Sequence, residues 1–212
     1  MQVYSLSAMA EPATPTAQPR RTQVQRSATT RAALLDAALE CLVEFGYANT
    51  TTSRVAERAG LSRGAPLHHF QTRTALVAAA IEHYADRRGE ELRGIVERMP
   101  EGRDRTGRSL DLLFELFCSP LFQGAVDLWA AARTDPELQA SLAPLERRLA
   151  RDTVVLYRLL FPAQADRQAL MDLVLNAIRG VSLLDVVMPG TGATAKQWRT
   201  SRALLVGLLD AE

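Results

Sequence analysis

Two adjacent histidines, His68 and His69, are the side chains in this 212-residue chain that first suggest a metal site or acid–base catalysis. Neighbouring residues on an α-helix point about 100° apart, so one helix cannot direct both imidazoles at the same ion. The third histidine is His83, and no cysteine or carboxylate accompanies the pair at metal-ligand spacing. No metal is therefore predicted. Two interpretations stay open for the pair: a polar surface or capping role, and contact with nucleic acid.

Other signatures of catalysis also fail to appear in the sequence. It contains no GxSxG, no HExxH and no glycine-rich phosphate loop. We therefore expect no enzyme and no cofactor. Cys41 and Cys118 lie in apolar, helix-like runs, which favours free buried thiols over a redox switch. No run reaches the ~18 apolar residues of a membrane span, and no signal peptide is recognised, so a cytoplasmic location is expected.

Short helices must position the two histidines. A first helix is predicted to end at Gly46, which stands where a C′ glycine is usual. Thr51 is the expected N-cap of a second helix, Ser62 that of a third and Thr72 that of a fourth. The second and third helices meet at Gly60-Leu61-Ser62, which is the pattern of a helix-turn-helix.

The whole chain is predicted to be all-α, because no stretch alternates with period two for long enough to form a strand. We expect a disordered N-terminal tail over 1–26, a helix-turn-helix domain over 27–73 and a larger helical domain over 74–212. In the larger domain, the predicted helices cover 108–118, 121–133, 137–160, 166–187 and 196–210. Pro144 should kink or split the third of these.

The stretch "GYANTTTSRVAERAGLSRGAPLHHFQTRTAL" closely resembles the DNA-binding domain of TetR-family transcriptional regulators, and the resemblance covers residues 27 to 77. It implies an N-terminal DNA-binding unit, a homodimer and a C-terminal domain that binds a small molecule. Two residues depart from the family pattern. Leu67 replaces a tyrosine whose hydroxyl often meets a phosphate, and Pro66 stands early in the third helix. We expect that helix to start tight or slightly bent.

The residue types in this segment suit contact with double-stranded DNA. Arg63 can donate two hydrogen bonds to a guanine, or it can be a surface arginine that contacts a phosphate. The start of the second helix can hold a phosphate. By resemblance, Arg73 clamps a phosphate, His68 faces base edges or sugar, and His69 faces a phosphate. The predicted DNA-contacting set is Thr51, Thr52, Ser53, Arg63, Gly64, Ala65, Leu67, His68, His69 and Arg73. In the tail, Arg20, Arg21 and Arg26 form either a minor-groove arm or merely a solvated segment.

The C-terminal helices carry two further expectations. The family resemblance predicts homodimerisation through 166–187 and 196–210, with an intramolecular core as the alternative. It also predicts a ligand pocket among the middle helices. Charged residues are scarce between positions 110 and 132, which favours an apolar or aromatic ligand. The candidate pocket residues are Phe114, Phe117, Phe122, Trp129, Tyr157 and Asn176.

These observations predict a ligand-responsive transcriptional regulator, acting as a repressor that binds a palindromic operator and leaves it when the effector binds. The net charge is only +1, but arginines outnumber carboxylates between positions 20 and 73, so the basic region is local. The alternative is a helical small-molecule or protein-binding module whose DNA-binding unit is impaired at Pro66 and Leu67.

Overall fold

The computed structural model describes residues 23–102 and 104–211. Within these ranges the chain is all-α, as predicted, with no strand. The elements are α1 (Gln23–Asn49), α2 (Thr52–Arg58), α3 (Ala65–His69), α4 (Arg73–Glu97), α5 (Arg105–Phe117), α6 (Pro120–Ala132), α7 (Pro136–Leu160), the 3-10 helix η1 (Pro162–Gln164), α8 (Gln168–Val187) and α9 (Ala193–Asp210).

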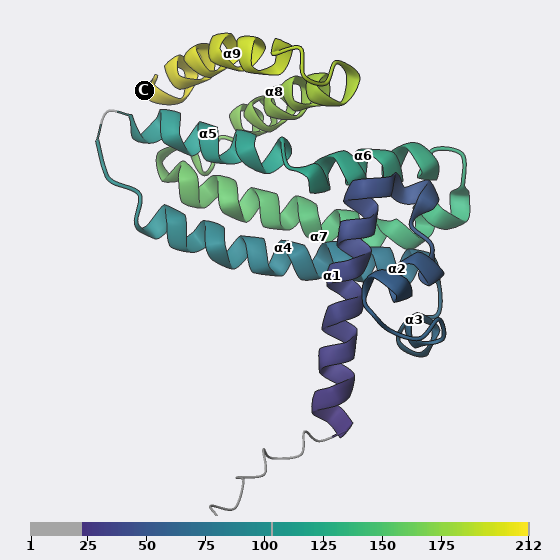
Figure 1. Cartoon of the computed structure of the whole chain (residues 1–212). Helices are drawn as coiled ribbons and strands as arrows, with labels where there is room; N and C mark the ends of the chain where they lie inside the picture. Colours follow the sequence, from purple (N-terminus) through teal and green to yellow (C-terminus); the bar gives the residue numbers. More distant parts are fainter. Residues whose placement is uncertain (1–22, 103, 212) are drawn as a thin grey trace, which may run out of the picture.

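The helices α1, α2 and α3 and the start of α4 form a small N-terminal unit with its own core. Leu34, Leu35 and Ala38 of α1 are buried against Val55 of α2 and Phe70, which follows α3. Figure 1 places α2 and α3 beside the C-terminal part of α1, while the first turns of α1 extend away from the rest of the molecule. The unit is a helix-turn-helix in which two apolar side chains fix the short α2 and α3 against α1.

Two glycines make the turns of this unit possible. Gly46 has φ 70° and breaks the helical geometry inside α1, and Gly60 has φ 66° directly after α2. Residues with a Cβ rarely adopt this left-handed region. At Gly60 an added Cβ would meet no neighbour within 4 Å, so the backbone conformation, not crowding, requires glycine there.

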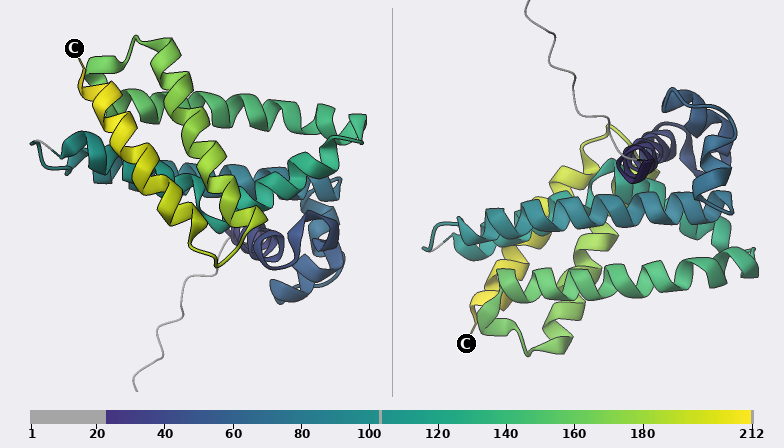
Figure 2. Two further views of the ribbon diagram at one scale, coloured as in Figure 1. Left: turned by 90° about the horizontal axis from the view of Figure 1, so that it is seen from above. Right: turned by 90° about the horizontal axis from the view of Figure 1, so that it is seen from below.

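The remaining helices form the larger unit. The long helices α4 and α7 pack side by side, α5 and α6 lie along them, and α8 and α9 pack against each other at one side of the molecule (Figures 1 and 2). A network joins α5 to α9: Asp111 accepts hydrogen bonds from the Trp198 indole (3.0 Å) and from Arg202 Nε (2.8 Å). Phe114 stacks on the Trp198 ring with centroids 4.1 Å apart.

The structure corrects several boundaries. The helix α1 begins at Gln23, so residues 23–26 of the expected disordered tail are helical, and Thr29 donates a hydrogen bond to Gln25 O in this first part. The rest of that expected tail lies outside the described residues. Ser62 does not cap α3, because that helix begins later, at Ala65, with no side-chain cap. Pro144 does not split α7, which is one helix from Pro136 to Leu160.

Within the described residues, no single helix is long and apolar enough to cross a membrane; α5 and residues 121–132 of α6 together meet that test only as a pair bent by 53°.

Both cysteines are free thiols, with Cys41 buried and Cys118 half-buried. Burial raises the pKa of Cys118 to about 11, and the nearby charges of Asp185 and Glu115 act in the same direction. Burial also raises the pKa of Cys41, although Arg58 and Arg54 oppose the shift.

Because the thiolate is the reactive form, both thiols should resist alkylation in the folded protein. We expect iodoacetamide at pH 8 to modify them at least ~10-fold more slowly than free cysteine, whose pKa is ~8.5. Mass spectrometry over a time course measures this rate, and the same protein in guanidinium chloride is the control. A native thiol that reacts as fast as free cysteine would contradict the protonated, buried state.

Candidate nucleic-acid interface and internal cavity

The start of α2 has the geometry of an anion-binding helix end. Thr51 is the N-cap, as predicted, and its hydroxyl accepts a hydrogen bond from Arg54 N at 3.2 Å. The first amides of a helix have no partner within it, and they carry partial positive charge. Thr52 and Ser53 supply these amides, and the Ser53 side chain is exposed. A phosphate contact at this end of α2 stays a prediction.

The helix α3 is short and begins tightly, as predicted for a helix with proline near its start. Ala65 N donates to Ser62 O at 3.0 Å, and Gly64 is the N-cap. Pro66 is buried. Leu67 is 62% exposed and His68 is exposed, while His69 is half-buried. An exposed leucine at this position offers a phosphate no hydrogen bond, but it can make apolar contact.

Arg63 is exposed on this surface and has no partner among the described residues. It precedes α3 in the turn at 63–64, and within the described residues it makes no hydrogen bond or ion pair. The neighbouring arginines differ. Arg58 forms ion pairs with Glu40 and Glu44 of α1, and Arg54 Nη1 donates to Asn49 O while its guanidinium lies 4.5 Å from the Phe45 ring centroid.

Arg73 opens α4, where it was predicted, but its guanidinium also has a structural role. Its Nη1 donates to Tyr47 O (3.3 Å) and Ala48 O (3.2 Å), and its Cζ lies 4.2 Å from the Tyr47 ring centroid. Thr72 caps α4 as predicted by accepting from Ala75 N at 3.0 Å. Arg73 therefore holds the end of α1 against the start of α4.

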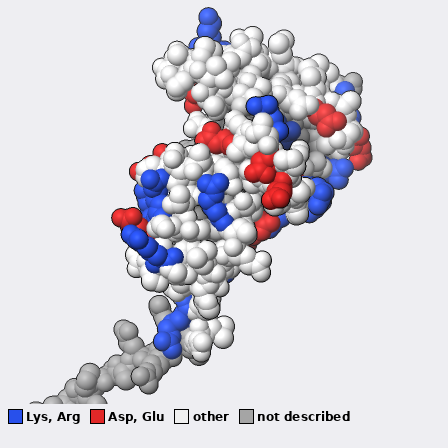
Figure 3. All heavy atoms as spheres, turned by 90° about the vertical axis from the view of Figure 1, so that its right-hand side faces the viewer, with Lys and Arg blue, Asp and Glu red and all other residues white. Residues whose placement is uncertain are grey.

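Sequence reasoning did not identify Arg31 on this side of the molecule. Its Cζ lies 5.2 Å from the ring centroid of Phe70, directly after α3. Arg26 lies nearer the start of α1, and Arg20 and Arg21 lie outside the described residues. Figure 3 shows basic side chains over the N-terminal unit and on the protruding start of α1, as separate groups with acidic residues between some of them. The basic character is therefore local and modest.

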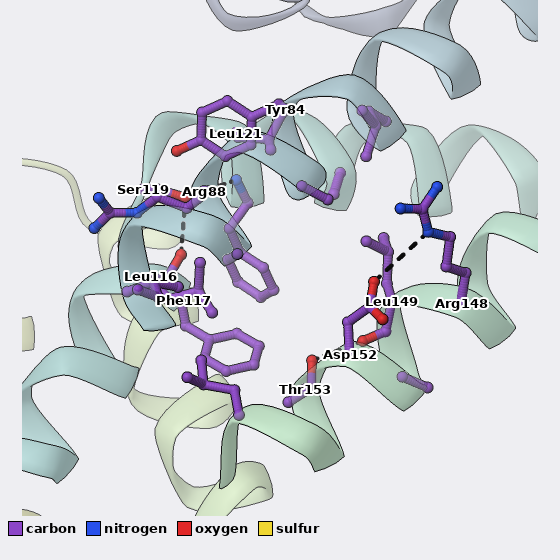
Figure 4. Close-up of a pocket in the computed structure, with 18 of the residues that line it drawn as sticks. Tyr84, Arg88, Leu116, Phe117, Ser119, Leu121, Arg148, Leu149, Asp152 and Thr153 are labelled. Carbon is purple, nitrogen blue, oxygen red and sulfur yellow. Dashed lines mark hydrogen bonds and ion pairs between the residues drawn. The ribbon is translucent and has the colours of Figure 1, made fainter. Parts of the chain in front are cut away.

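A cavity of about 290 Å³ lies between α4, α6 and α7 and reaches the end of α5 and α8. Phe117, Phe122 and Trp129, three of the six predicted pocket residues, line it. They form a row with edge-to-face contacts, in which Phe122 lies 5.2 Å from Phe117 and 5.7 Å from Trp129 between ring centroids. Figure 4 shows Tyr84, Leu116, Phe117 and Leu121 around this space, with Arg148 and Asp152 joined on another wall.

The other three predicted pocket residues do not line this cavity. Phe114 is occupied by its stack on Trp198. Tyr157 is fully buried in the core beside Phe161, and its hydroxyl has no hydrogen-bond partner within the described part of the chain. Asn176 is exposed on α8. Aromatic residues at helical spacing fill the core as well as cavities, and the sequence pattern does not distinguish these two positions.

Sequence reasoning missed the charged part of the cavity wall. Arg88 and Arg93 come from α4, Arg148 from α7 and Arg179 from α8. All four lie outside the charge-poor stretch 110–132, on which the expectation of an apolar or aromatic ligand was based. That stretch supplies the aromatic row of the cavity, and the ligand type stays a prediction.

The helices α8 and α9 leave large apolar side chains exposed. On α8, Leu173 (50% exposed), Leu183 and Val187 (74%) are exposed, and Leu173 and Val187 are fourteen residues apart, so they lie on one side of the helix. On α9, Leu204 is 67% and Leu208 45% exposed. Gly180 lies within the α8 stripe, and an added Cβ there would meet nothing within 4 Å. Contiguous exposed apolar residues of this kind mark contact surfaces more often than scattered ones do.

A helix-turn-helix with exposed basic and polar residues, joined to a helical body with a cavity, is typical of DNA-binding regulators that carry both parts in one polypeptide. Comparison with known proteins agrees. Residues 34–80 match the model of the family described as "Bacterial regulatory proteins, tetR family". The HTH-type transcriptional regulator CymR of Pseudomonas putida is 30% identical over 171 residues, which cover 77% of this chain and 83% of CymR.

Solved structures share the fold. A transcriptional regulator from Rhodococcus sp. Rha1 superposes with a TM-score of 0.64 at 20% identity, over 84% of this chain and 95% of that one. FadR of Bacillus subtilis, in complex with stearoyl-CoA, superposes with a TM-score of 0.61 at 14% identity, over 82% of this chain and 97% of FadR. The chain belongs to the TetR family of bacterial transcriptional regulators. Its relatives are regulators, so it acts on transcription and is not an enzyme.

Proposed function

We propose that this chain is a ligand-responsive repressor that binds a palindromic operator as a homodimer and is released when a small molecule enters the cavity. The observation that carries the proposal is the pairing of an unpartnered, exposed Arg63 at the start of α3 with a cavity whose wall includes α6. A bacterial transcriptional regulator meets its DNA in the cytoplasm, so we place the protein there.

Packing between α6 and α1 supports a route from the cavity to the DNA-binding unit. Phe122 and Trp129 of α6 line the cavity, whereas Gly124 of the same helix faces Leu42 of α1. A Cβ at Gly124 would lie 2.9 Å from Leu42 Cγ, so the two helices touch with no room to spare. A ligand that displaces α6 would therefore displace α1 and α2–α3 with it. Release follows if the ligand favours a separation of the two recognition helices that no longer fits the operator.

The exposed apolar residues of α8 and α9 support the homodimer. A two-fold dimer uses the same patch on both subunits, and helices with small residues such as Gly180 can approach closely. Dimerisation would place two copies of α3 on half-sites about one helical turn of DNA apart. Because the basic surface of each subunit is modest, tight and specific binding to the operator requires both subunits.

Fluorescence anisotropy against the DNA upstream of the chain's own gene tests the proposal. The titration is repeated with a scrambled duplex of the same length and across a salt series. Tight, salt-sensitive binding to the upstream duplex alone is the expected result. Equal, weak binding to both duplexes would favour the alternative, a helical binding module with an impaired DNA-binding unit, and Leu67→Tyr then tests whether a phosphate-contacting hydroxyl restores affinity.

Arg73→Ala should weaken binding about evenly across operator variants. Loss of one phosphate contact lowers the salt slope by ~0.9. Anisotropy at four or more salt concentrations measures that slope. Because Arg73 also binds Tyr47 O and Ala48 O, thermal unfolding of the variant must be measured alongside. Arg73→Lys retains the charge and is the matched control. A loss confined to particular base pairs would contradict the phosphate role.

A further inference from the structure

The cavity has an uneven charge distribution around an apolar centre, and this distribution indicates what kind of molecule fits it. We infer that the effector is an amphipathic organic anion whose carboxylate pairs with Arg179. Its apolar body would be one or two rings, or a chain of similar size. The inference rests on the environment of Arg179, on the aromatic row beside it and on the pairing of the other charged residues in the wall. The inference rests on the proposed function, because it specifies the ligand of the same cavity.

Most charged side chains of the wall are already matched. Arg148 forms an ion pair with Asp86 and lies 3.6 Å from Asp152, and Arg88 pairs with Glu91 at 3.0 Å. Figure 4 shows the Arg148–Asp152 pair on its own wall, across the space from Phe117. These groups need no ligand charge to neutralise them.

Arg93 of the same wall has no hydrogen-bond or ion-pair partner among the described residues, but it is exposed to solvent. Arg179 differs from all these groups, because it is half-buried and unpaired. Among the described residues its guanidinium has no hydrogen-bond or ion-pair partner, and its Cζ lies 5.4 Å from the centroid of the Phe117 ring. The side chain is half-buried at the α8 end of the cavity. A guanidinium that has given up part of its hydration without an acceptor gains strongly from a carboxylate, which takes two parallel N–H donors.

The aromatic row leads directly away from this cation. Phe117, under Arg179, contacts Phe122, which contacts Trp129. A molecule whose carboxylate meets Arg179 would therefore lay its apolar part along Phe122 and Trp129. The cavity volume, about 290 Å³, is just below the ~300–1,000 Å³ usual for small-ligand sites, so the body is small.

A carboxylate at the other end of the row defines the competing ligand class. Glu146 accepts a hydrogen bond from the Trp129 indole Nε1 and makes no ion pair within the described residues. With the aromatic rings beside it, this group would suit an organic cation. The indole donor partly satisfies Glu146, whereas no polar group satisfies Arg179, and this difference favours the anion.

Isothermal titration calorimetry of the full chain with three probes of one shape tests the inference. The probes are 4-phenylbutanoate, 4-phenylbutanamide and 4-phenylbutylammonium, at pH 7.5 and without DNA. We expect the carboxylate to bind at least ~10-fold more tightly than the amide, and the ammonium to bind most weakly. In Arg179→Met the affinity for the carboxylate should fall to within ~3-fold of the affinity for the amide. The affinity for the amide should be nearly unchanged, because only the charged contact is lost.

Two further variants keep the test decisive. Arg179→Lys retains the charge and should keep part of the preference for the carboxylate. Arg151→Met removes an exposed arginine of α7 that does not line the cavity, so the affinities for the three probes should not change. Tightest binding of the ammonium, or binding of none of the probes at 2 mM, would overturn the inference. A protein that binds its operator in the anisotropy assay but fails here keeps the proposed regulatory function and loses only this ligand class.

Discussion

Leu204→Glu should convert the protein from dimer to monomer in sedimentation velocity and weaken operator binding by roughly 100-fold. Leu204 is 67% exposed on α9 in the single chain, within the apolar surface that we assign to the homodimer. In a two-fold interface the substitution occurs twice, and an unpaired buried charge costs ~3–5 kcal/mol. A monomer would reach one half-site only, so affinity falls with self-association.

Ala195→Glu is the matched control for this prediction. It adds the same charge to the same helix at another exposed position. Because the two positions are nine residues apart, their side chains point to opposite sides of a helix with ~3.6 residues per turn. Ala195→Glu should remain dimeric and bind the operator normally. A dimeric Leu204→Glu variant, or a monomeric parent protein that still binds its operator tightly, would contradict the assigned interface.

Arg63→Ala should cost about 1–3 kcal/mol of operator binding and relax specificity at one base pair in each half-site. Arg63 is exposed before α3 and has no partner in the described part of the chain, so its removal should leave folding almost unchanged. Anisotropy against a panel of single-base operator variants measures both the affinity and the preference.

Two substitutions separate base reading from general charge attraction. Arg63→Lys keeps the charge but loses the two-pronged donor geometry, so it should recover affinity at low salt without full specificity. Arg151→Ala removes an exposed arginine from α7, away from the helix-turn-helix, and should have no effect. If Arg63→Ala leaves the ranking of the operator variants unchanged, Arg63 contacts only the backbone of the DNA.

Local sequence signals predicted the N-terminal unit well, because its turns and caps depend on single residues. The side chains of Thr51 and Thr72 accept the hydrogen bonds expected of N-caps, and Gly60, where the second and third helices were predicted to meet, has a positive φ. The start of α3 was placed wrongly at Ser62. A serine before a proline-containing helix is only a candidate cap, and here the helix begins at Ala65, with Pro66 in its first turn, where a missing amide is tolerated.

The cavity could not be predicted to the same depth, because its wall comes from separate helices. Phe114 and Phe122 look alike in sequence, but Phe114 stacks on Trp198 and Phe122 lines the cavity. Arg179 reads as an ordinary surface arginine in α8, and only the packing of α8 against the end of α5 sets it over Phe117. Long-range contacts of this kind leave no local pattern.

In the proposed homodimer, the brevity of α3 limits how much sequence information each subunit can read. Its five residues, Ala65–His69, extend ~7.5 Å along the helix axis at ~1.5 Å per residue, which is about two base-pair steps of ~3.4 Å. So few base pairs recur often by chance in any chromosome. The spacing between half-sites and the deformability of the DNA between them must then carry much of the discrimination. Altering the length of that spacer should impair recognition more than changing most of its bases.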